Sequence, residues 1–200
     1  MRPNEVIDLL TRALALPDAP SSDFDLNPSF HMPAGRSLRP AGVLVAVDLS
    51  GDAPSVILTK RSAKLKHHPG QIAFAGGKQD PQDADPVAAA LREAYEEIGL
   101  PYGAARVLGT LPTHETITGF LVTPVVAVIT TPFTPIPEVG EVVEVFRVPL
   151  AHLLDPRHYR IESRQAQGGP RYFYTVPYGP YYIWGATARM LRGLAERVHR

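Results

Sequence analysis

Prolines restrict the fold of this chain more than any other feature of its sequence. They number 21 among 200 residues, which is about twice the usual share of roughly 5%. Because a proline breaks the interior of a helix and removes a hydrogen-bond donor from a central strand, long regular elements are disfavoured. The chain is therefore expected to fold from short helices and strands, and not as a long-helix bundle or a coiled coil.

Residues 1–40 are predicted to form an N-terminal helix followed by a proline-rich arm. Apolar residues at helical spacing indicate a helix over 4–16, with Asn4 as its N-cap. The stretch that follows contains five prolines among scattered Ser, Asp and Asn residues, a composition typical of an extended segment. The main domain is predicted to cover 41–200, a length that can bury a core of ordinary size.

The main domain contains short strand-like runs and two helices. The clearest helix covers 86–98, where Asp85 is a plausible N-cap, Pro86 the first helical residue and Gly99 the stop. Since strands do not alternate strictly with helices, the pattern favours a mixed sheet flanked by helices over a doubly wound parallel sheet. The other predicted elements are strands at 42–49, 55–59, 72–75, 106–111, 120–130, 142–148 and 171–176 and a helix at 186–198.

Charge and cysteine content argue against several classes of protein. Lys and Arg together number 20, as do Asp and Glu, whereas a general binder of nucleic acid or anionic membranes carries a basic excess. The absence of Cys excludes thiolate nucleophiles, disulfides and Cys-ligated zinc. The longest strongly apolar stretch, 120–129, is shorter than the roughly 20 residues that span a bilayer. We expect a cytoplasmic protein, and the oligomeric state stays open.

Three glutamates of the 86–98 helix indicate a metal site. Glu93 and Glu97 are four residues apart and Glu96 is three after Glu93, so a helix places them on one face. A hard cation such as Mg²⁺, which takes oxygen ligands, would offset their repulsion. Arg92 can orient a carboxylate, although a solvated acidic face explains the helix equally well. Five apolar residues are expected to pack inward from the other side: Val87, Leu91, Ala94, Tyr95 and Ile98.

The segment from Gly77 to Leu100 resembles the box of the Nudix hydrolases. That box runs Gly, five residues, Glu, seven residues, then Arg-Glu-aliphatic-any-Glu-Glu-any-Gly-aliphatic. The chain departs from it at Asp83, which replaces the first Glu and precedes Arg92 by one residue more than usual, and at Ala94. Seven positions within 24 residues match, which is a specific signal: Gly77, Arg92, Glu93, Glu96, Glu97, Gly99 and Leu100.

Residues 58–77 resemble an additional box of the coenzyme A pyrophosphatase branch of Nudix enzymes. That box reads approximately Leu-Leu-Thr-any-Arg-Ser, then Leu-(Arg/Lys)-any-His-any-Gly-Gln-(Ile/Val)-Ala-Phe-Pro-Gly-Gly, and the visible departure is Ala75 in place of Pro. Asp83 and Ala94 are ordinary residues in this branch. The resemblance covers about 41–198, because three later segments are also similar: Thr116–Phe120, Glu144–Leu150 and Ile183–Arg189.

The resemblance implies an α+β fold, a Nudix-like mixed sheet flanked by helices as an α/β/α sandwich. It also implies Mg²⁺- or Mn²⁺-dependent hydrolysis of coenzyme A to 3′,5′-ADP and 4′-phosphopantetheine. Glu93 and Glu97 would hold the metal, Glu96 would be a further ligand or the base, and Arg92 would belong to the catalytic set. Apart from the resemblance, Glu138, Glu141 and Glu144 lie on a loop that leads into a strand, and one of them, which we take to be Glu141, is a candidate extra ligand or base. Basic groups suit this anionic substrate. The expected substrate-binding residues are Arg61, Lys66, Gln71, Phe74, Gly76 and Gly77.

Two other functions are weighed against this one. A Nudix enzyme could act on another nucleoside diphosphate derivative such as ADP-ribose, NADH or a nucleoside triphosphate, against which the 58–77 segment argues. A non-catalytic nucleotide-binding regulator would be marked by the loss of a core Glu, and all three are present. Trp184 is interpreted as a packing residue rather than a stacking platform, and no catalytic triad is assigned to Ser62 or His114.

Overall fold

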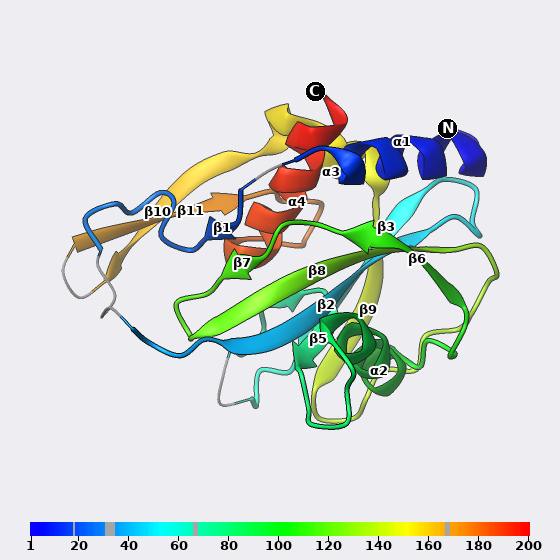
Figure 1. Ribbon diagram of the computed structural model, residues 1–200, viewed down its shortest axis with the longest axis horizontal. Helices are drawn as coiled ribbons and strands as arrows, with labels where there is room; N and C mark the ends of the chain where they lie inside the picture. The colour runs from blue at the N-terminus through cyan, green and yellow to red at the C-terminus, as the bar shows by residue number, and fades with distance from the viewer. Residues whose placement is uncertain (18, 31–34, 66–67, 167–168) are drawn as a thin grey trace.

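A mixed β-sheet lies at the centre of the computed structural model, with helices on both of its faces (Figure 1). Helix α2 (Pro86–Ile98) covers one face, while α1 (Pro3–Ala15), α3 (Leu150–Leu154) and α4 (Gly185–Val198) lie on the other. The predicted α+β architecture is therefore confirmed. Among the described residues, no helix is both long enough and apolar enough to cross a membrane. The structure describes all residues of the chain except 18, 31–34, 66–67 and 167–168.

Two long parallel strands form the middle of the sheet. Strand β2 (Arg39–Asp48) pairs with β8 (Phe120–Ile129) along its whole length, from Arg39 opposite Phe120 to Asp48 opposite Ile129. Strand β3 (Ser55–Arg61) turns back antiparallel to β2 and forms a hairpin with it, in the place of the predicted strands at 42–49 and 55–59. The remaining strands of this sheet are β1 (Ser21–Ser22), β4 (Ile72–Ala73), β5 (Ala75–Lys78), β6 (Ala105–Thr110), β7 (His114–Glu115) and β9 (Val142–Pro149).

The predicted strand at 72–75 is in fact two strands that separate at Phe74. Strand β4 pairs with β3, whereas β5 pairs with β2, from Ala41 opposite Lys78 to Leu44 opposite Ala75. This switch of partner carries the chain across the sheet. It places the backbone of Gly76 and Gly77 beside α2, which packs against both β2 and β5.

Alternating residues of β2 fill two separate cores, as the pleat of a strand requires. Leu44 and Ala46 pack beneath α2. Val45 and Val47, which point to the opposite face, join the core beneath α1 and α4. The buried strip of α2 is narrow, and Tyr95 lies outside it with 47% exposure, stacked on Tyr102. The expectation that Tyr95 packs inward is therefore wrong. Ala94, one position earlier on the helix, occupies the inward place.

The N-terminal helix packs on α4 rather than standing apart from the main domain. Its Val6 and Leu10 are fully buried in the core, and the Arg197 guanidinium donates a hydrogen bond to the carbonyl of Ala13 at 2.9 Å. The helix is capped by Arg2, whose backbone N–H and side chain bond to the Glu5 carboxylate. The prediction of Asn4 as N-cap is wrong, because Pro at the first helical position starts the helix earlier.

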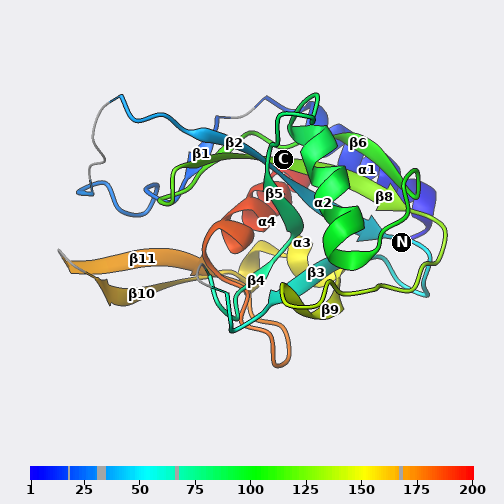
Figure 2. The same cartoon turned by 90° about the horizontal axis from the view of Figure 1, so that it is seen from below.

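A second, two-stranded sheet projects from one end of the molecule (Figure 2). It consists of β10 (Arg160–Ala166) and β11 (Gly169–Thr175), paired antiparallel in continuous register. Sequence analysis found only the second of these strands. Strand β10 is mostly exposed and its sequence, Arg-Ile-Glu-Ser-Arg-Gln-Ala, is too polar to give a strand signal. We refer to β10 and β11 together as the projecting hairpin.

The proline-rich arm lies at the same end of the molecule as the projecting hairpin in both views (Figures 1 and 2). Strand β1, which belongs to the arm, pairs in parallel with β7. Further along, the Asn27 side chain bonds to the backbone of Tyr172 twice, donating to its carbonyl at 2.9 Å and accepting from its N–H at 2.8 Å. The arm therefore bridges the central sheet and the projecting hairpin.

Candidate active site

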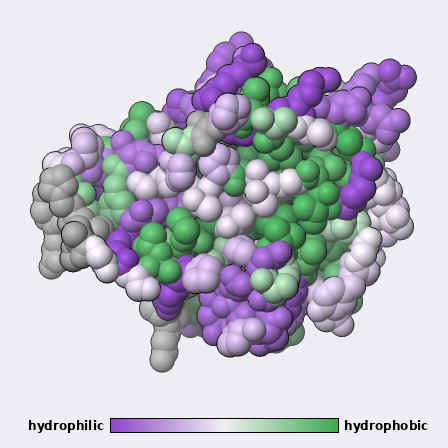
Figure 3. All heavy atoms as spheres, viewed as in Figure 1, coloured by the Kyte–Doolittle hydropathy of each residue, from purple (hydrophilic) through white to green (hydrophobic). Residues whose placement is uncertain are grey.

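Helix α2 carries the acidic residues and is held by two local signals at its ends. The Asp85 carboxylate accepts a hydrogen bond from the N–H of Ala88 at 2.8 Å, and Gly99 ends the helix with φ +66°. Both signals were predicted from the sequence. Between them, Glu93 and Glu97 face the backbone of β5, and hydrophilic side chains gather at the edge of the molecule where α2 lies (Figure 3).

The glycine pair of β5 lets the backbone approach these two carboxylates. The N–H of Gly76 donates to Oε2 of Glu97 at 3.1 Å. A Cβ atom on Gly77 would lie 2.5 Å from Oε1 of Glu93, closer than real side chains permit. Gly76 itself has φ +154° and packs against β2, so a side chain there would meet backbone.

Arg92 binds three carboxylates at once. Its Nε and Nη2 atoms donate to Asp83 at 3.0 and 2.9 Å, and Nη1 donates to Glu93 at 3.0 Å and to Glu96 at 2.8 Å. Asp83 also accepts from the N–H of Asp80, so its carboxylate is occupied by hydrogen bonds within the protein. Hydrogen bonds from Arg92 hold the pKa of Asp83 below its ordinary value. In this arrangement Arg92 acts as a positioning residue, and its place in the catalytic set stays a prediction.

Burial makes the two inward glutamates hard to ionise. It raises the pKa of Glu97, which is 3% exposed, to about 7, and it also raises the pKa of Glu93. The negative charge of Glu141 adds to both effects. Positive charge offsets this only in part: Arg92 donates a hydrogen bond to Glu93, and Nη1 of Arg61 lies 3.6 Å from Glu97. Nε of Arg61 is buried without a hydrogen-bond partner in the described part of the chain. A bound cation would relieve this imbalance.

The donor set suits a hard divalent cation. Mg²⁺ usually takes one or two protein carboxylates and completes its shell with water and substrate phosphate oxygens. Glu93 and Glu97 supply such a pair, and no sulfur or imidazole ligand is needed. Within the described residues, no three His, Asp or Glu side chains are already arranged around one metal position. Glu96 is exposed and bound to Arg92, so its role as a ligand stays a prediction.

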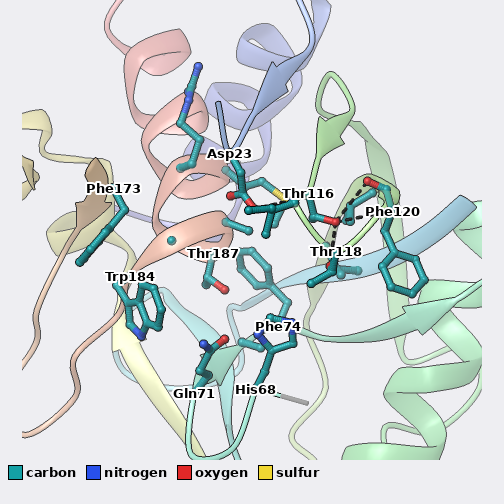
Figure 4. A pocket seen from close by; sticks show the side chains of 18 of the residues that line it. Asp23, His68, Gln71, Phe74, Thr116, Thr118, Phe120, Phe173, Trp184 and Thr187 are labelled. Atoms are coloured by element: carbon teal, nitrogen blue, oxygen red, sulfur yellow. Dashed lines mark hydrogen bonds between the residues drawn. The ribbon is translucent and has the colours of Figure 1, made fainter. Parts of the chain in front are cut away.

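A cavity of about 690 Å³ opens beside the glycine pair. Figure 4 shows its two sides, with Thr116, Thr118 and Phe120 opposite Phe173 and Trp184. All predicted substrate-binding residues in the described part of the chain line it: Arg61, Gln71, Phe74, Gly76 and Gly77. Lys66 falls outside the described residues. The arm and the projecting hairpin also supply lining residues, among them Asp23, Asp25, Arg164 and Arg171.

Sequence reasoning missed the aromatic side of this cavity. Trp184 is only partly buried and lines the cavity, so it is not a core residue, although its ring does pack on Phe173. The Phe173 ring lies 5.1 Å from it, and the Arg164 guanidinium lies 5.0 Å from the centre of the indole. No short motif could have revealed this group, because its members come from three separate elements.

Ser21, His114 and Asp23 are in contact, but the contact fastens the arm rather than forming a catalytic triad. Oγ of Ser21 lies 2.9 Å from Nδ1 of His114, whose Nε2 lies 3.3 Å from Asp23. His114 is fully buried in the sheet, where no substrate reaches it. Burial opposes ionisation of Asp23, yet hydrogen bonds from His114 and from the N–H of Ile117 lower its pKa.

Comparison with known proteins identifies the family. The NUDIX domain model matches residues 38–167. The chain belongs to the Nudix family. Two relatives, from Enterobacter sp. and from Cronobacter sakazakii, are each named an uncharacterized Nudix hydrolase NudL. Over 160 residues, this chain is 38% identical to the first and 41% identical to the second. Each match covers 80% of this chain and 83% of the relative.

A solved structure supports the same fold. The MutT protein from Methanosarcina mazei Go1 superposes with a TM-score of 0.52 at 18% identity, over 84% of this chain and 97% of that one. The match to the NUDIX domain model confirms, at the level of the family, the resemblance of the 77–100 segment to the Nudix box. The chain is a Nudix hydrolase, and members of this family generally require divalent cations such as Mg²⁺ or Mn²⁺.

Proposed function

We propose that this Nudix hydrolase cleaves the diphosphate bond of coenzyme A, or of a derivative, to give 3′,5′-ADP and 4′-phosphopantetheine. The proposal rests on the position of the 58–77 segment, which lines the cavity. Its Arg61, Gln71 and Phe74 line the same cavity as the glycine pair beside Glu93 and Glu97. A cavity of about 690 Å³ also falls within the range of small-molecule sites.

The chain's own residues would position the diphosphate and the metal ligands. Glu93 and Glu97 would hold Mg²⁺ or Mn²⁺, which when bound neutralises diphosphate oxygens and lowers the pKa of a coordinated water. The hydrogen bond from Gly76 fixes Glu97, and Arg92 fixes Glu93. The Arg61 guanidinium lines the cavity next to Glu97, where it can bind a phosphate oxygen.

The reaction is an in-line displacement that depends on positioning and charge. A water oxygen bonds to one phosphorus, the bond from that phosphorus to the bridging oxygen breaks, and a carboxylate accepts the water's proton. Glu96 and Glu141 are the two proposed acceptors. Glu96 is exposed on α2, and Glu141 lies in the loop before β9, where its charge acts on both Glu93 and Glu97.

A turnover assay tests the proposal directly. The protein is incubated with coenzyme A and Mg²⁺ or Mn²⁺, and the products are separated by chromatography. We expect 3′,5′-ADP and 4′-phosphopantetheine, with Glu97→Gln at least about 100-fold slower and the exposed-turn variant Asp52→Asn unchanged. Intact coenzyme A under these conditions, or a higher kcat/KM for ADP-ribose, NADH or a nucleoside triphosphate, would overturn the assignment.

A further inference from the structure

One side of the cavity carries an aromatic group that the proposed hydrolysis does not use. Trp184 precedes α4, Phe173 belongs to β11, and Arg164 reaches over the indole from β10. Figure 4 shows Phe173 and Trp184 across the cavity from Thr118 and Phe120. Aromatic rings of this kind bind nucleobases by stacking, and an adjacent arginine strengthens the contact.

The arginines of the cavity differ in whether a carboxylate already neutralises them. Arg61 pairs with Glu97. Arm residues neutralise two others: Asp23 lies 3.6 Å from Arg171, and Asp25 lies 3.0 Å from Arg189. Among the residues that the structure describes, two cavity arginines have no carboxylate within 4 Å: Arg39 and Arg164.

Arg39 is less available than Arg164 to bind a ligand. Its guanidinium lies 4.0 Å from the centre of the Phe120 ring and donates to the carbonyl of Thr118 at 3.3 Å. Arg164 has only its contact with the Trp184 ring among the interactions found in the described part of the chain. It sits directly opposite Arg171 across the projecting hairpin, but Arg171 is already paired with Asp23. Arg164 is therefore the arginine of this pair that is left to bind an anionic ligand.

We propose that Arg164 and Trp184 form the subsite for the nucleoside end of coenzyme A. The adenine ring takes the place of the Arg164 guanidinium over the indole of Trp184, and the guanidinium pairs instead with the 3′-phosphate, whose geometry and charge it matches. This inference rests on the proposed function and adds a specificity determinant to it. It predicts that the enzyme distinguishes coenzyme A from dephospho-coenzyme A, which has the same diphosphate but no 3′-phosphate.

The experiment compares kcat/KM for these two substrates in the wild type and in variants. We expect the wild type to prefer coenzyme A by about tenfold, the effect of one exposed charge-assisted pair. Arg164→Gln should remove this preference by raising KM for coenzyme A only. Arg160→Gln is the matched control, because Arg160 is exposed on the same strand but does not line the cavity. Trp184→Leu should weaken the binding of both substrates alike, since both carry adenine.

Three outcomes overturn the inference: Arg164→Gln affecting both substrates equally, Arg164→Gln affecting neither, or Arg39→Gln removing the preference in its place. If the wild type cleaves neither substrate, the proposed function fails, and the subsite is judged by calorimetric binding. Wild type should then bind 3′,5′-ADP more tightly than 5′-AMP, and Arg164→Gln should bind the two equally. An equal affinity of the wild type for both nucleotides would disprove the subsite independently of catalysis.

Discussion

Nε2 of His114 lies 3.3 Å from Oδ1 of Asp23, and this contact fastens the proline-rich arm to the central sheet. His114 belongs to β7 and is fully buried, whereas Asp23 follows β1 in the arm and lines the cavity. Asp23 also accepts a hydrogen bond from the N–H of Ile117 and pairs with Arg171 of the projecting hairpin. The Asp23 carboxylate thus joins the arm to strand β7, to the loop that follows β7 and to the projecting hairpin.

Replacing this carboxylate should release the arm and destabilise the protein. Asp23→Asn keeps the size of the side chain but removes its charge beside His114 and Arg171. We expect the free energy of unfolding to fall by about 1–3 kcal/mol, because buried polar partners lose their hydrogen bonds. Urea denaturation measures the loss, and limited proteolysis measures exposure of the arm. Asp52→Asn, in an exposed turn, is the control, and equal stability of the two variants would disprove the anchoring role.

Substitution by alanine should have different effects at the two glycines of β5, Gly77 and Gly76. In Gly77→Ala the new Cβ would meet Glu93, whose side chain ends near that position, so the proposed metal ligand is displaced while the backbone stays intact. We expect activity to fall at least about tenfold, as for misplaced site residues, with little change in melting temperature. Steady-state kinetics and thermal unfolding separate these effects.

In Gly76→Ala the new Cβ would lie 2.4 Å from the carbonyl oxygen of Gly42, and φ is +154°. Backbone cannot yield as a side chain does, so we expect a loss of more than about 2 kcal/mol of folding stability. Gly51→Ala is the control, because nothing lies within 4 Å of its Cβ position. Similar stability of the Gly76 and Gly77 variants would contradict this distinction.

The parts of the fold that could be predicted are those determined by neighbouring residues. The bounds of α2 follow from Asp85, Pro86 and Gly99, which cap the helix through contacts within a few positions. The β2–β3 hairpin follows from two apolar runs around a turn. The Nudix box falls in the same category, since its spacing on α2 and β5 determines which side chains meet.

The cavity wall could not be predicted, because its contacts join distant parts of the chain. Asn27 bonds to Tyr172 across 145 positions of sequence, and no local pattern marks either residue. Trp184 resembles a packing residue until the projecting hairpin places Phe173 and Arg164 beside it. The prediction of an extended arm described its composition correctly but gave no indication of the surface on which it docks.

Arg92 should control metal affinity through the carboxylates that it orients. Lys in its place keeps one charge but cannot bond to Asp83, Glu93 and Glu96 together. We expect Arg92→Lys to bind Mn²⁺ about 10- to 100-fold more weakly, the usual effect of losing such support. Titration followed by electron paramagnetic resonance measures free Mn²⁺ independently of turnover. Arg106→Lys, on exposed β6, is the control, and unchanged Mn²⁺ affinity in Arg92→Lys would disprove the positioning role.

The ion pair between Asp48 and Arg147 should make stability depend on pH in the acid range. Asp48 is 3% exposed, and its carboxylate accepts a hydrogen bond from Nε of Arg147 at 2.7 Å. Burial opposes its charge, but hydrogen bonds from Ser50 and Arg147 together lower its pKa below its ordinary value. A carboxyl whose folded pKa is depressed stabilises the protein above the unfolded pKa of about 3.9. That contribution disappears as the pH falls through the folded value.

We therefore expect Asp48→Asn to unfold at a lower temperature than the wild type at pH 7, by an amount equivalent to about 1–3 kcal/mol. The difference should shrink as the pH falls below about 4, because the wild-type carboxyl becomes protonated as the pH passes its lowered folded pKa and loses its pairing with Arg147. Thermal unfolding of both proteins across this range, by circular dichroism, measures the change. A difference that stays constant from pH 7 to pH 2 would show that packing, not the charge of Asp48, accounts for the effect.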